Sequence, residues 1–215
     1  GAETPLTAGG CSWLGKVTSC TDASLTNGQP YFYKVSAVNA MGESGQSNEA
    51  GATPASAPTQ LMSNPGFENG STNPAPWVAT SGVIGSPAGE LPHSGGWDAW
   101  LDGYGTTHTD TLYQQVTIPS SVSTAQLGFW LHIDTAETSS TTAYDTLKVQ
   151  VRNASGTVLG TLATYSNLNA ASGYTQKTFD LSAYKGQTIQ IYLLGQEGST
   201  LQTSFVVDDF TLNVQ

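Results

Sequence analysis

Two carboxylates near opposite ends of the C-terminal two thirds of the chain carry the clearest chemical signal. Glu68 follows a large apolar residue in "SNPGFENG", and Asp208 lies in the strand-like run "SFVVDDFTLN". Period-2 counting in that run places Asp208 on the same face as Phe210 and Leu212, close to a core. A buried carboxylate must take up a proton or find compensating charge, and residues 186–215 contain no Lys or Arg. Calcium is the sensible compensation, because it prefers several hard oxygen ligands.

Three further acids form a second group that could hold a cation. Asp102, Asp110 and Asp145 each lie where a strand-like run begins or ends, so their side chains could converge on one rim of a sandwich. Convergent carboxylates would again favour calcium. The alternative is that these Asp side chains cap turns, which is common. Glu68 and Asp208 have a similar alternative, a surface position for the first and bonding to backbone amides for the second.

Aromatic and polar side chains on two strand-like runs predict a binding face. In "LGFWLHID" and "YDTLKVQVR" one set of alternate residues is apolar and points inward, which leaves the other set facing solvent or a loop. If both runs lie in one sheet, the outward residues form a platform that stacks sugar rings or peptide groups. The predicted ligand-binding residues are Trp100, Trp130, His132, Tyr144, Gln150 and Arg152. The alternative is that a loop or the first domain covers Trp130.

The sequence shows no constellation for catalysis. It has no G-x-S-x-G elbow, H-E-x-x-H helix, P-loop or dinucleotide-binding glycine motif. The three histidines, His93, His108 and His132, are scattered along the chain. Glu68 and Asp208 have a more economical role as metal ligands than as a pair for glycoside hydrolysis. We therefore expect this chain to be non-catalytic.

The elements that must position these residues are β-strands. The chain has 215 residues, 38% of them hydrophobic and only 10% charged, with abundant Gly, Ser and Thr. This composition predicts an all-β protein with many turns. Sixteen acidic against six basic residues give a net charge of −10, so phosphate backbones and anionic headgroups are repelled. Nucleic acid and membranes are therefore not expected partners, and no long apolar run predicts a membrane span.

A Pro-containing segment, residues 54–59, predicts a linker between a first domain, residues 1–53, and a second, residues 60–215. The spacing of several residues before the linker resembles the last strands of a fibronectin type III domain. In this resemblance Tyr31 matches the tyrosine whose hydroxyl pins a corner of the sandwich. A complete module has about seven strands and about 100 residues, so we expect a partial one and a natural start before residue 1. The residues that carry the resemblance are Leu25, Gly28, Tyr31, Val35, Ala37, Asn39 and Gly42.

Nine strand-like runs follow the linker, with turn signals between them and no long helical period. They predict an antiparallel two-sheet sandwich, and we favour a jelly roll. The motifs "NPGFE" near the first run and "VDDF" in the last resemble the two ends of calcium-binding jelly-roll modules of the carbohydrate-binding, galactose-binding-like kind. This resemblance implies that a structural calcium ion ties the first strand to the last through Glu68 and Asp208.

The order of the runs resembles more closely a C-terminal domain appended to secreted bacterial peptidases and other extracellular hydrolases. The runs that carry this resemblance are "SGGWDAWLDGYG", "DTLYQQVTIP", "FWLHIDTAET", "YDTLKVQV", "TFDLSAYKGQTIQIYL" and "SFVVDDFTL". It implies a non-catalytic accessory region that binds polymeric substrate, carbohydrate or protein, beside an upstream catalytic domain in the same chain. A purely structural spacer or surface-attachment module is the main alternative, and an independent enzyme is a third.

The two cysteines predict a disulfide. Cys11 and Cys20 lie in the polar, turn-rich stretch "CSWLGKVTSC" rather than in an apolar strand. An even count in an acidic, Lys-poor β protein suits an oxidising compartment, so we expect one bridge and a secreted, extracellular protein. Two free thiols are the alternative.

Overall fold

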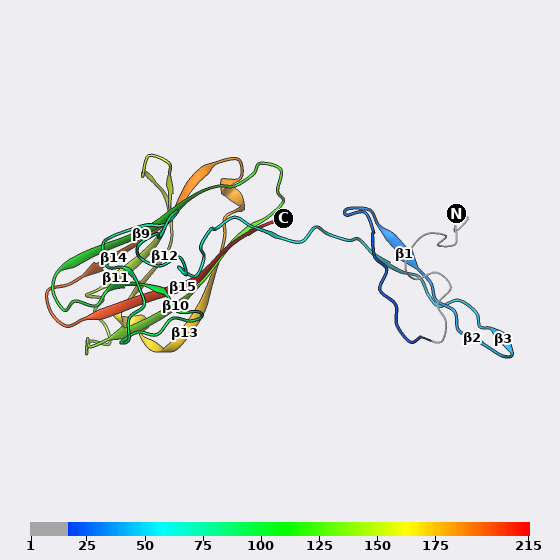
Figure 1. The fold of residues 1–215 in the computed structure, drawn as a ribbon, viewed down its shortest axis with the longest axis horizontal. Helices are drawn as coiled ribbons and strands as arrows, with labels where there is room; N and C mark the ends of the chain where they lie inside the picture. The colour runs from blue at the N-terminus through cyan, green and yellow to red at the C-terminus, as the bar shows by residue number, and fades with distance from the viewer. Residues whose placement is uncertain (1–16) are drawn as a thin grey trace. The chain divides into compact units, whose positions relative to one another are not determined.

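The computed structural model describes residues 17–215 and shows an all-β protein (Figure 1). Within these residues there is no α-helix, and the only helical elements are two short 3₁₀ turns, η1 Asn167–Asn169 and η2 Ser182–Tyr184. No helix in this part of the chain is long and apolar enough to cross a membrane. The chain divides into two compact units, Gly1–Ala57 and Pro58–Gln215, and the division falls inside the predicted linker segment.

The described part of the smaller unit consists of two short antiparallel pairs. Strand β1 (Tyr31–Tyr33) pairs with β4 (Ala50–Ala52), and β2 (Val38–Asn39) pairs with β3 (Gly42–Glu43). The backbone N–H of Thr26 donates to the Tyr31 hydroxyl at 3.0 Å, which is the kind of contact expected of a corner tyrosine. The fibronectin type III resemblance itself stays a prediction. The disulfide prediction also stays one, because Cys11 lies outside the described residues.

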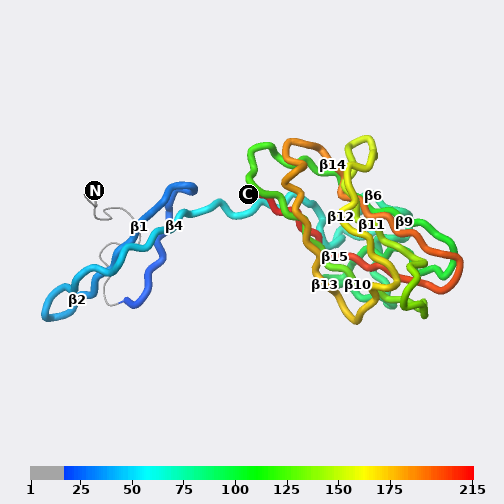
Figure 2. The backbone as a smooth tube through the Cα atoms, turned by 180° about the vertical axis from the view of Figure 1, so that it is seen from behind, coloured from blue at the N-terminus to red at the C-terminus, as the bar shows by residue number. Residues whose placement is uncertain are grey.

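The larger unit is a sandwich of two antiparallel sheets (Figures 1 and 2). The six-stranded sheet has the order β13-β10-β15-β8-β7, with β5 also pairing with β15, and the five-stranded sheet has the order β12-β11-β14-β9-β6. The strands are β5 (Thr59–Gln60), β6 (Val78–Ala79), β7 (Ile84–Gly85), β8 (Asp98–Asp102), β9 (His108–Thr117), β10 (Ala125–Thr135), β11 (Thr146–Asn153), β12 (Val158–Ser166), β13 (Ala171–Asp180), β14 (Thr188–Glu197) and β15 (Thr203–Val214). The predicted fold class is confirmed.

Alternating apolar residues from the two sheets fill the space between them. Leu127, Phe129 and Leu131 of β10 are at most 1% exposed, and so are the alternate residues Leu147, Val149 and Val151 of β11. These are the residues that period-2 alternation predicts to point inward, because successive side chains of a strand face opposite sides of the sheet. The inward face of both strands is therefore confirmed.

Strand β15 departs from the predicted alternation at its middle. Leu127 of β10 lies opposite Leu212, but Trp130 lies opposite Asp208, so the register shifts by one residue between these points. Strand β15 therefore has one extra residue here, which forms a β-bulge at Asp209, where φ is 50°. Asp208 therefore does not share the inward face with Phe210 and Leu212, as counting predicted. It is fully buried on the outer side of the sheet instead.

The phenylalanine contacts in the core give the first testable prediction. Phe129 is fully buried, and its ring stacks on Phe210 with a centroid distance of 4.9 Å and an interplanar angle of 19°. We expect Phe129→Ala to lower the free energy of unfolding by about 3–5 kcal/mol, because the sheets cannot close the resulting cavity. Urea unfolding measures the loss. The exposed Val158, changed to Ala, serves as a control and should cost about 0.5 kcal/mol or less.

Candidate functional site

The predicted ligand-binding residues do not form one platform, because the condition for it, that both runs lie in one sheet, is not met. Ligand binding by the individual residues stays a prediction. Strand β10 pairs with β13 and β15, whereas β11 pairs with β12 and β14, so the two strands belong to opposite sheets. Tyr144 precedes β11 and is 53% exposed at one end of the sandwich. Trp100, Trp130 and His132 lie on the outer side of the six-stranded sheet, and Gln150 and Arg152 lie on the outer side of the five-stranded sheet.

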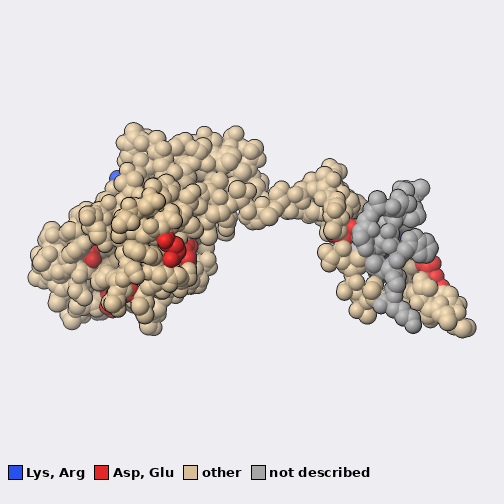
Figure 3. Space-filling view, viewed as in Figure 1, with Lys and Arg blue, Asp and Glu red and all other residues tan. Residues whose placement is uncertain are grey.

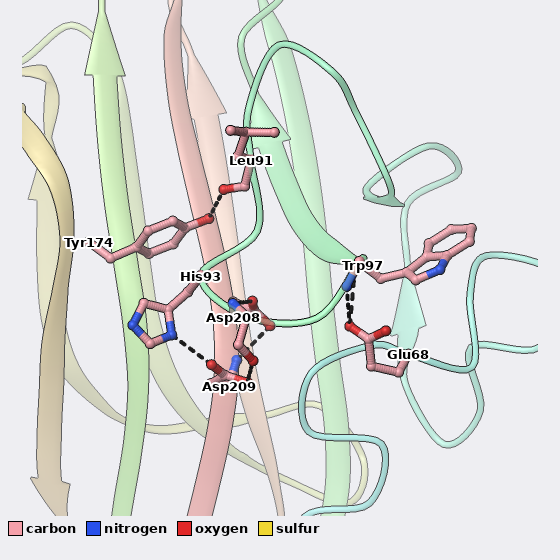
Figure 4. A network of polar contacts seen from close by, with 9 residues as sticks. Glu68, Leu91, His93, Trp97, Tyr174, Asp208 and Asp209 are labelled. Atoms are coloured by element: carbon pink, nitrogen blue, oxygen red, sulfur yellow. Dashed lines mark hydrogen bonds and ion pairs between the residues drawn. The ribbon is translucent and has the colours of Figure 1, made fainter.

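The connection between β7 and β8, residues 86–97, lies over the outer side of the six-stranded sheet, and we call it the covering segment. The His93 ring stacks on Trp130 at 4.0 Å with an interplanar angle of 14°. The Tyr174 hydroxyl donates to the Leu91 carbonyl at 3.0 Å (Figure 4). The covering segment therefore occupies the ring face of Trp130 that a sugar would need. The alternative that a loop covers this tryptophan is the one that the structure shows.

Asp98 lies beneath the covering segment without a hydrogen-bond partner. It is fully buried, and within residues 17–215 neither of its carboxylate oxygens has a partner. Burial raises its pKa to about 7, with further contributions from the negative charges of Asp208 and Glu90. His132 Nε2 lies 3.7 Å from Glu90 Oε2, so an imidazole borders this group of acids. This side of the sandwich is thus acidic and closed.

Glu68 and Asp208 are joined through the backbone of the covering segment (Figure 4). Glu68 Oε1 accepts hydrogen bonds from the N–H groups of Gly96 and Trp97 at 2.9 and 3.2 Å. Asp208 Oδ2 accepts from the Ser94 N–H at 3.0 Å. Both carboxylates therefore bind amides of one short loop. This is the alternative that the sequence left open for Asp208.

Two glycines make room for this arrangement. A Cβ atom at Gly95 would collide with the Glu68 carboxylate, and Gly95 has a φ of 65°. A Cβ at Gly66 would lie 3.2 Å from Asp209 Oδ1 and 3.6 Å from Asp208 Oδ1. Each glycine thus lets an acidic side chain lie directly against the backbone, Glu68 at Gly95 and the two acids of β15 at Gly66. Within residues 17–215, however, no three or more Asp, Glu, His or Cys side chains are grouped so that they could hold a metal ion.

The second predicted group of acids does lie together at one end of the sandwich. The Asp102 N–H donates to Asp110 Oδ2 at 2.9 Å, and the Gly198 N–H donates to Asp145 Oδ1 at 2.7 Å. Glu197, which was not among the predicted residues, accepts hydrogen bonds from the backbone N–H groups of residues 104 and 105. Figure 3 shows Asp and Glu in small groups on the visible face of the larger unit, with hardly any Lys or Arg.

Asp102 is the unusual member of this group. It is 4% exposed, and neither carboxylate oxygen has a hydrogen-bond partner among the described residues. Its φ of 61° is uncommon for a residue with a side chain. Burial raises its pKa to about 8, and the charges of Asp110, Glu197 and Asp145 add to the shift. Asp110 and Asp145, by contrast, bind N–H groups, as turn-capping acids do.

The outer side of the five-stranded sheet carries a stack of flat side chains. Tyr113 of β9 and Tyr192 of β14 are cross-strand partners, with ring centroids 5.3 Å apart and an interplanar angle of 11°. The Arg152 guanidinium lies 3.4 Å from the Tyr192 ring centroid. Its Nε and Nη2 groups both donate to Gln150 Oε1, at 3.0 and 2.7 Å. The stack therefore crosses three strands and is held by a side-chain amide.

We call this surface the open face. Beside the stack, the Lys148 ammonium donates to Gln196 Oε1 at 3.1 Å. The sequence pattern pointed to Gln150 and Arg152 but to neither tyrosine. Alternation with the buried Leu112 and Leu193 could have placed them outward, although not side by side. The residues of the open face are Tyr113, Lys148, Gln150, Arg152, Gln190, Tyr192 and Gln196.

Comparisons with known proteins show what this sandwich is similar to. No protein-family model matches the chain, and no curated protein matches it. Among solved structures, TmCBM61 in complex with β-1,4-galactotriose has a TM-score of 0.52 and 19% identity, over 73% of this chain and 99% of that one. A structure of carbohydrate-binding modules from the β-sandwich superfamily has a TM-score of 0.50 and 15% identity, over 95% and 82%.

A third solved structure is the CBM22-1 xylan-binding domain of Paenibacillus barcinonensis Xyn10C. It has a TM-score of 0.46 and 15% identity, over 75% of this chain and 97% of that chain. The first two structures, with TM-scores of 0.52 and 0.50 and identities below 25%, establish the fold alone. The larger unit therefore has the β-sandwich jelly-roll fold of carbohydrate-binding modules.

The buried carboxyl of Asp102 predicts how stability depends on pH in a calcium-chelating buffer. Its pKa is 3.8 ordinarily and about 8 in the folded protein, so between these values the folded state holds a proton that the unfolded state releases. Stability should therefore fall as pH rises through this window, and thermal melts measure the fall. Asp102→Asn should flatten the slope, whereas the exposed Asp134→Asn should not. A slope unchanged by Asp102→Asn would contradict the assignment.

Proposed function

We propose that the larger unit binds carbohydrate without catalysis, through the open face. The observation that carries this proposal is the stack of Tyr113, Tyr192 and Arg152, braced by Gln150, on an outer sheet surface. Aromatic rings beside fixed hydrogen-bonding groups are what sugar recognition requires. The fold similarity to TmCBM61, which was solved with a galactotriose, supports the same conclusion.

The geometry of the stack determines how a sugar would bind. The two flat faces of Tyr192 are occupied by Tyr113 on one side and Arg152 on the other. A glycan would therefore contact ring edges, phenol hydroxyls and the guanidinium rather than lie flat on Tyr192. Gln150 is only 7% exposed and its oxygen accepts twice from Arg152, so its role would be to hold the guanidinium toward the sugar.

We propose further that this is an accessory region of a secreted bacterial hydrolase, a peptidase being the first candidate. The support is the resemblance of its strand-like runs to domains appended to such enzymes. Binding polymeric substrate would raise its effective concentration near a catalytic domain elsewhere in the same protein. Carbohydrate is the favoured polymer, because the open face supplies hydrogen-bonding amides and hydroxyls. A structural spacer without a ligand is the competing function.

A structural calcium ion is also part of the proposal. The acids of the opening segment and β15 fit such an ion in chemistry, since Glu68 and Asp208 present hard oxygens whose amide bonds leave lone pairs. Asp209 is less available, because its carboxylate oxygens already contact His93 Nδ1 and Ser94 Oγ. The unpartnered Asp102 supports a second, separate ion. Side chains alone do not complete either site, so main-chain carbonyls would have to supply further ligands. Calcium would neutralise charge there and tie strands together.

Changes on the open face test the carbohydrate proposal. We expect Tyr192→Ala to weaken binding of a galactan or xylan oligosaccharide by about tenfold or more, because the stack and the fixed guanidinium are both lost. Isothermal titration calorimetry measures the affinity. Trp130→Ala, on the opposite sheet, is the matched control and should leave the affinity unchanged. No detectable binding of any polysaccharide by the folded wild-type chain would favour the spacer.

Thermal melts with and without calcium test the metal proposal. We expect calcium to raise the melting temperature in a concentration-dependent manner, because an ion that binds only the folded state stabilises it. Glu68→Gln should remove most of the increase, since one charged ligand is lost while the amide bonds can persist. Asp102→Asn should remove only the part of the increase in melting temperature that comes from the second ion. A melting temperature that calcium leaves unchanged would overturn the proposal.

A further inference from the structure

Charges of opposite sign are segregated on the larger unit. Residues 58–215 contain twelve acids and only four Lys or Arg. On the five-stranded sheet, Asp110 and Glu197 point inward, and β6, β11 and β12 contain no acid. Within the described residues the outer side of this sheet therefore carries no carboxylate. Two of the four cations of the unit, Lys148 and Arg152, lie there.

Neither cation on the open face is neutralised within the described residues. The Arg152 guanidinium contacts the Tyr192 ring and the Gln150 amide, and the Lys148 ammonium bonds to the Gln196 amide. No acid of residues 17–215 forms an ion pair with either one. Neutral partners fix the positions of these side chains while leaving their charges available. A protein with surplus acids could have paired them at little cost.

From this arrangement we propose that the open face recognises glycans that carry carboxylates, that is, polysaccharides containing uronic acids. This inference rests on the proposed carbohydrate-binding function and names its substrate class. A planar guanidinium matches a carboxylate with two parallel hydrogen bonds, and Arg152 is already held in place by its stack. Neutral sugars would use the amides and phenols but leave both charges without a partner.

Distances along β11 allow one glycan chain to reach both cations. Lys148 and Arg152 are four residues apart on the same side of the strand, which is about 13 Å at 3.3 Å per residue. The net negative charge of the unit does not prevent such binding. At physiological ionic strength the screening length is about 8 Å, so acids elsewhere act weakly on a carboxylate in contact with Arg152. They do disfavour adsorption of polyanions anywhere except the open face.

The test compares one glycan with and without its charge. Short oligogalacturonides and their methyl esters share a backbone and differ in the carboxylate, so the ratio of their affinities for the intact chain isolates the charge. With calcium held constant, we expect the acidic form to bind about tenfold more tightly at low salt, as one charge-assisted hydrogen bond gives. The ratio should shrink with added salt. Calorimetry measures both affinities.

Substitutions then locate the effect. Arg152→Gln should bring the ratio close to one, and Lys148→Gln should lower it by a smaller factor. Lys185→Gln removes the same charge from the turn before β14 and should leave the ratio unchanged. Melting curves check that each variant folds, which is expected because these side chains lie on the surface.

Each outcome has a defined meaning. A wild-type ratio of one or less, with the ester still bound, overturns the uronate inference and leaves the carbohydrate-binding function standing. Binding of neither form nor of any neutral glycan overturns both. A ratio that survives Arg152→Gln and Lys148→Gln together shows that the charges of the open face do not select the ligand, and this also overturns the inference.

Discussion

Pairing of β15 with three other strands is the interaction on which the rest of the larger unit depends. Strand β15 lies between β10 and β8 and also pairs with β5, so the six-stranded sheet would not hold together without this strand. Its bulge turns Asp208 to the outer side while Phe210 stays in the core. The covering segment binds to the carboxylate placed there, and one outer surface of the sandwich is closed as a result. The open face is left on the other sheet.

Much of the fold could be predicted from local pattern, because a strand shows its period in its own residues. The inward sets of β10 and β11 followed directly from alternation, and each of the nine predicted runs contains strand. Sheet membership could not be predicted in this way. Trp130 and Arg152 looked like members of one platform, yet β10 finds its partner in β15, more than seventy residues along the chain. Such non-local pairings leave no trace in the period of a single strand.

For the acids, too, the sequence predicts which side chains lie near one another but not which of them have hydrogen-bond partners. Asp102, Asp110 and Asp145 lie together as their places at strand ends predicted, because strand ends of a sandwich meet at its rims, while their role as metal ligands stays a prediction. The sequence could not show that Asp102, alone among these three acids, lacks a hydrogen-bond partner within the described residues, since backbone N–H groups satisfy the other two. Nor could it foresee the bulge at Asp209, which reversed the parity of Asp208. Backbone conformation thus decided which carboxylates are satisfied and which remain a source of instability.

The pairing of β5 with β15 has a consequence for how this unit can be combined with others. Thr59 and Val214 are direct partners in the ladder, so the polypeptide enters and leaves the sandwich at neighbouring points. A domain whose two ends lie close together can be inserted between two neighbouring residues of a host protein. Such insertions are tolerated best in surface loops. The larger unit is therefore suited to insertion as an intact domain into a loop of another protein, because the insertion would not interrupt its strands.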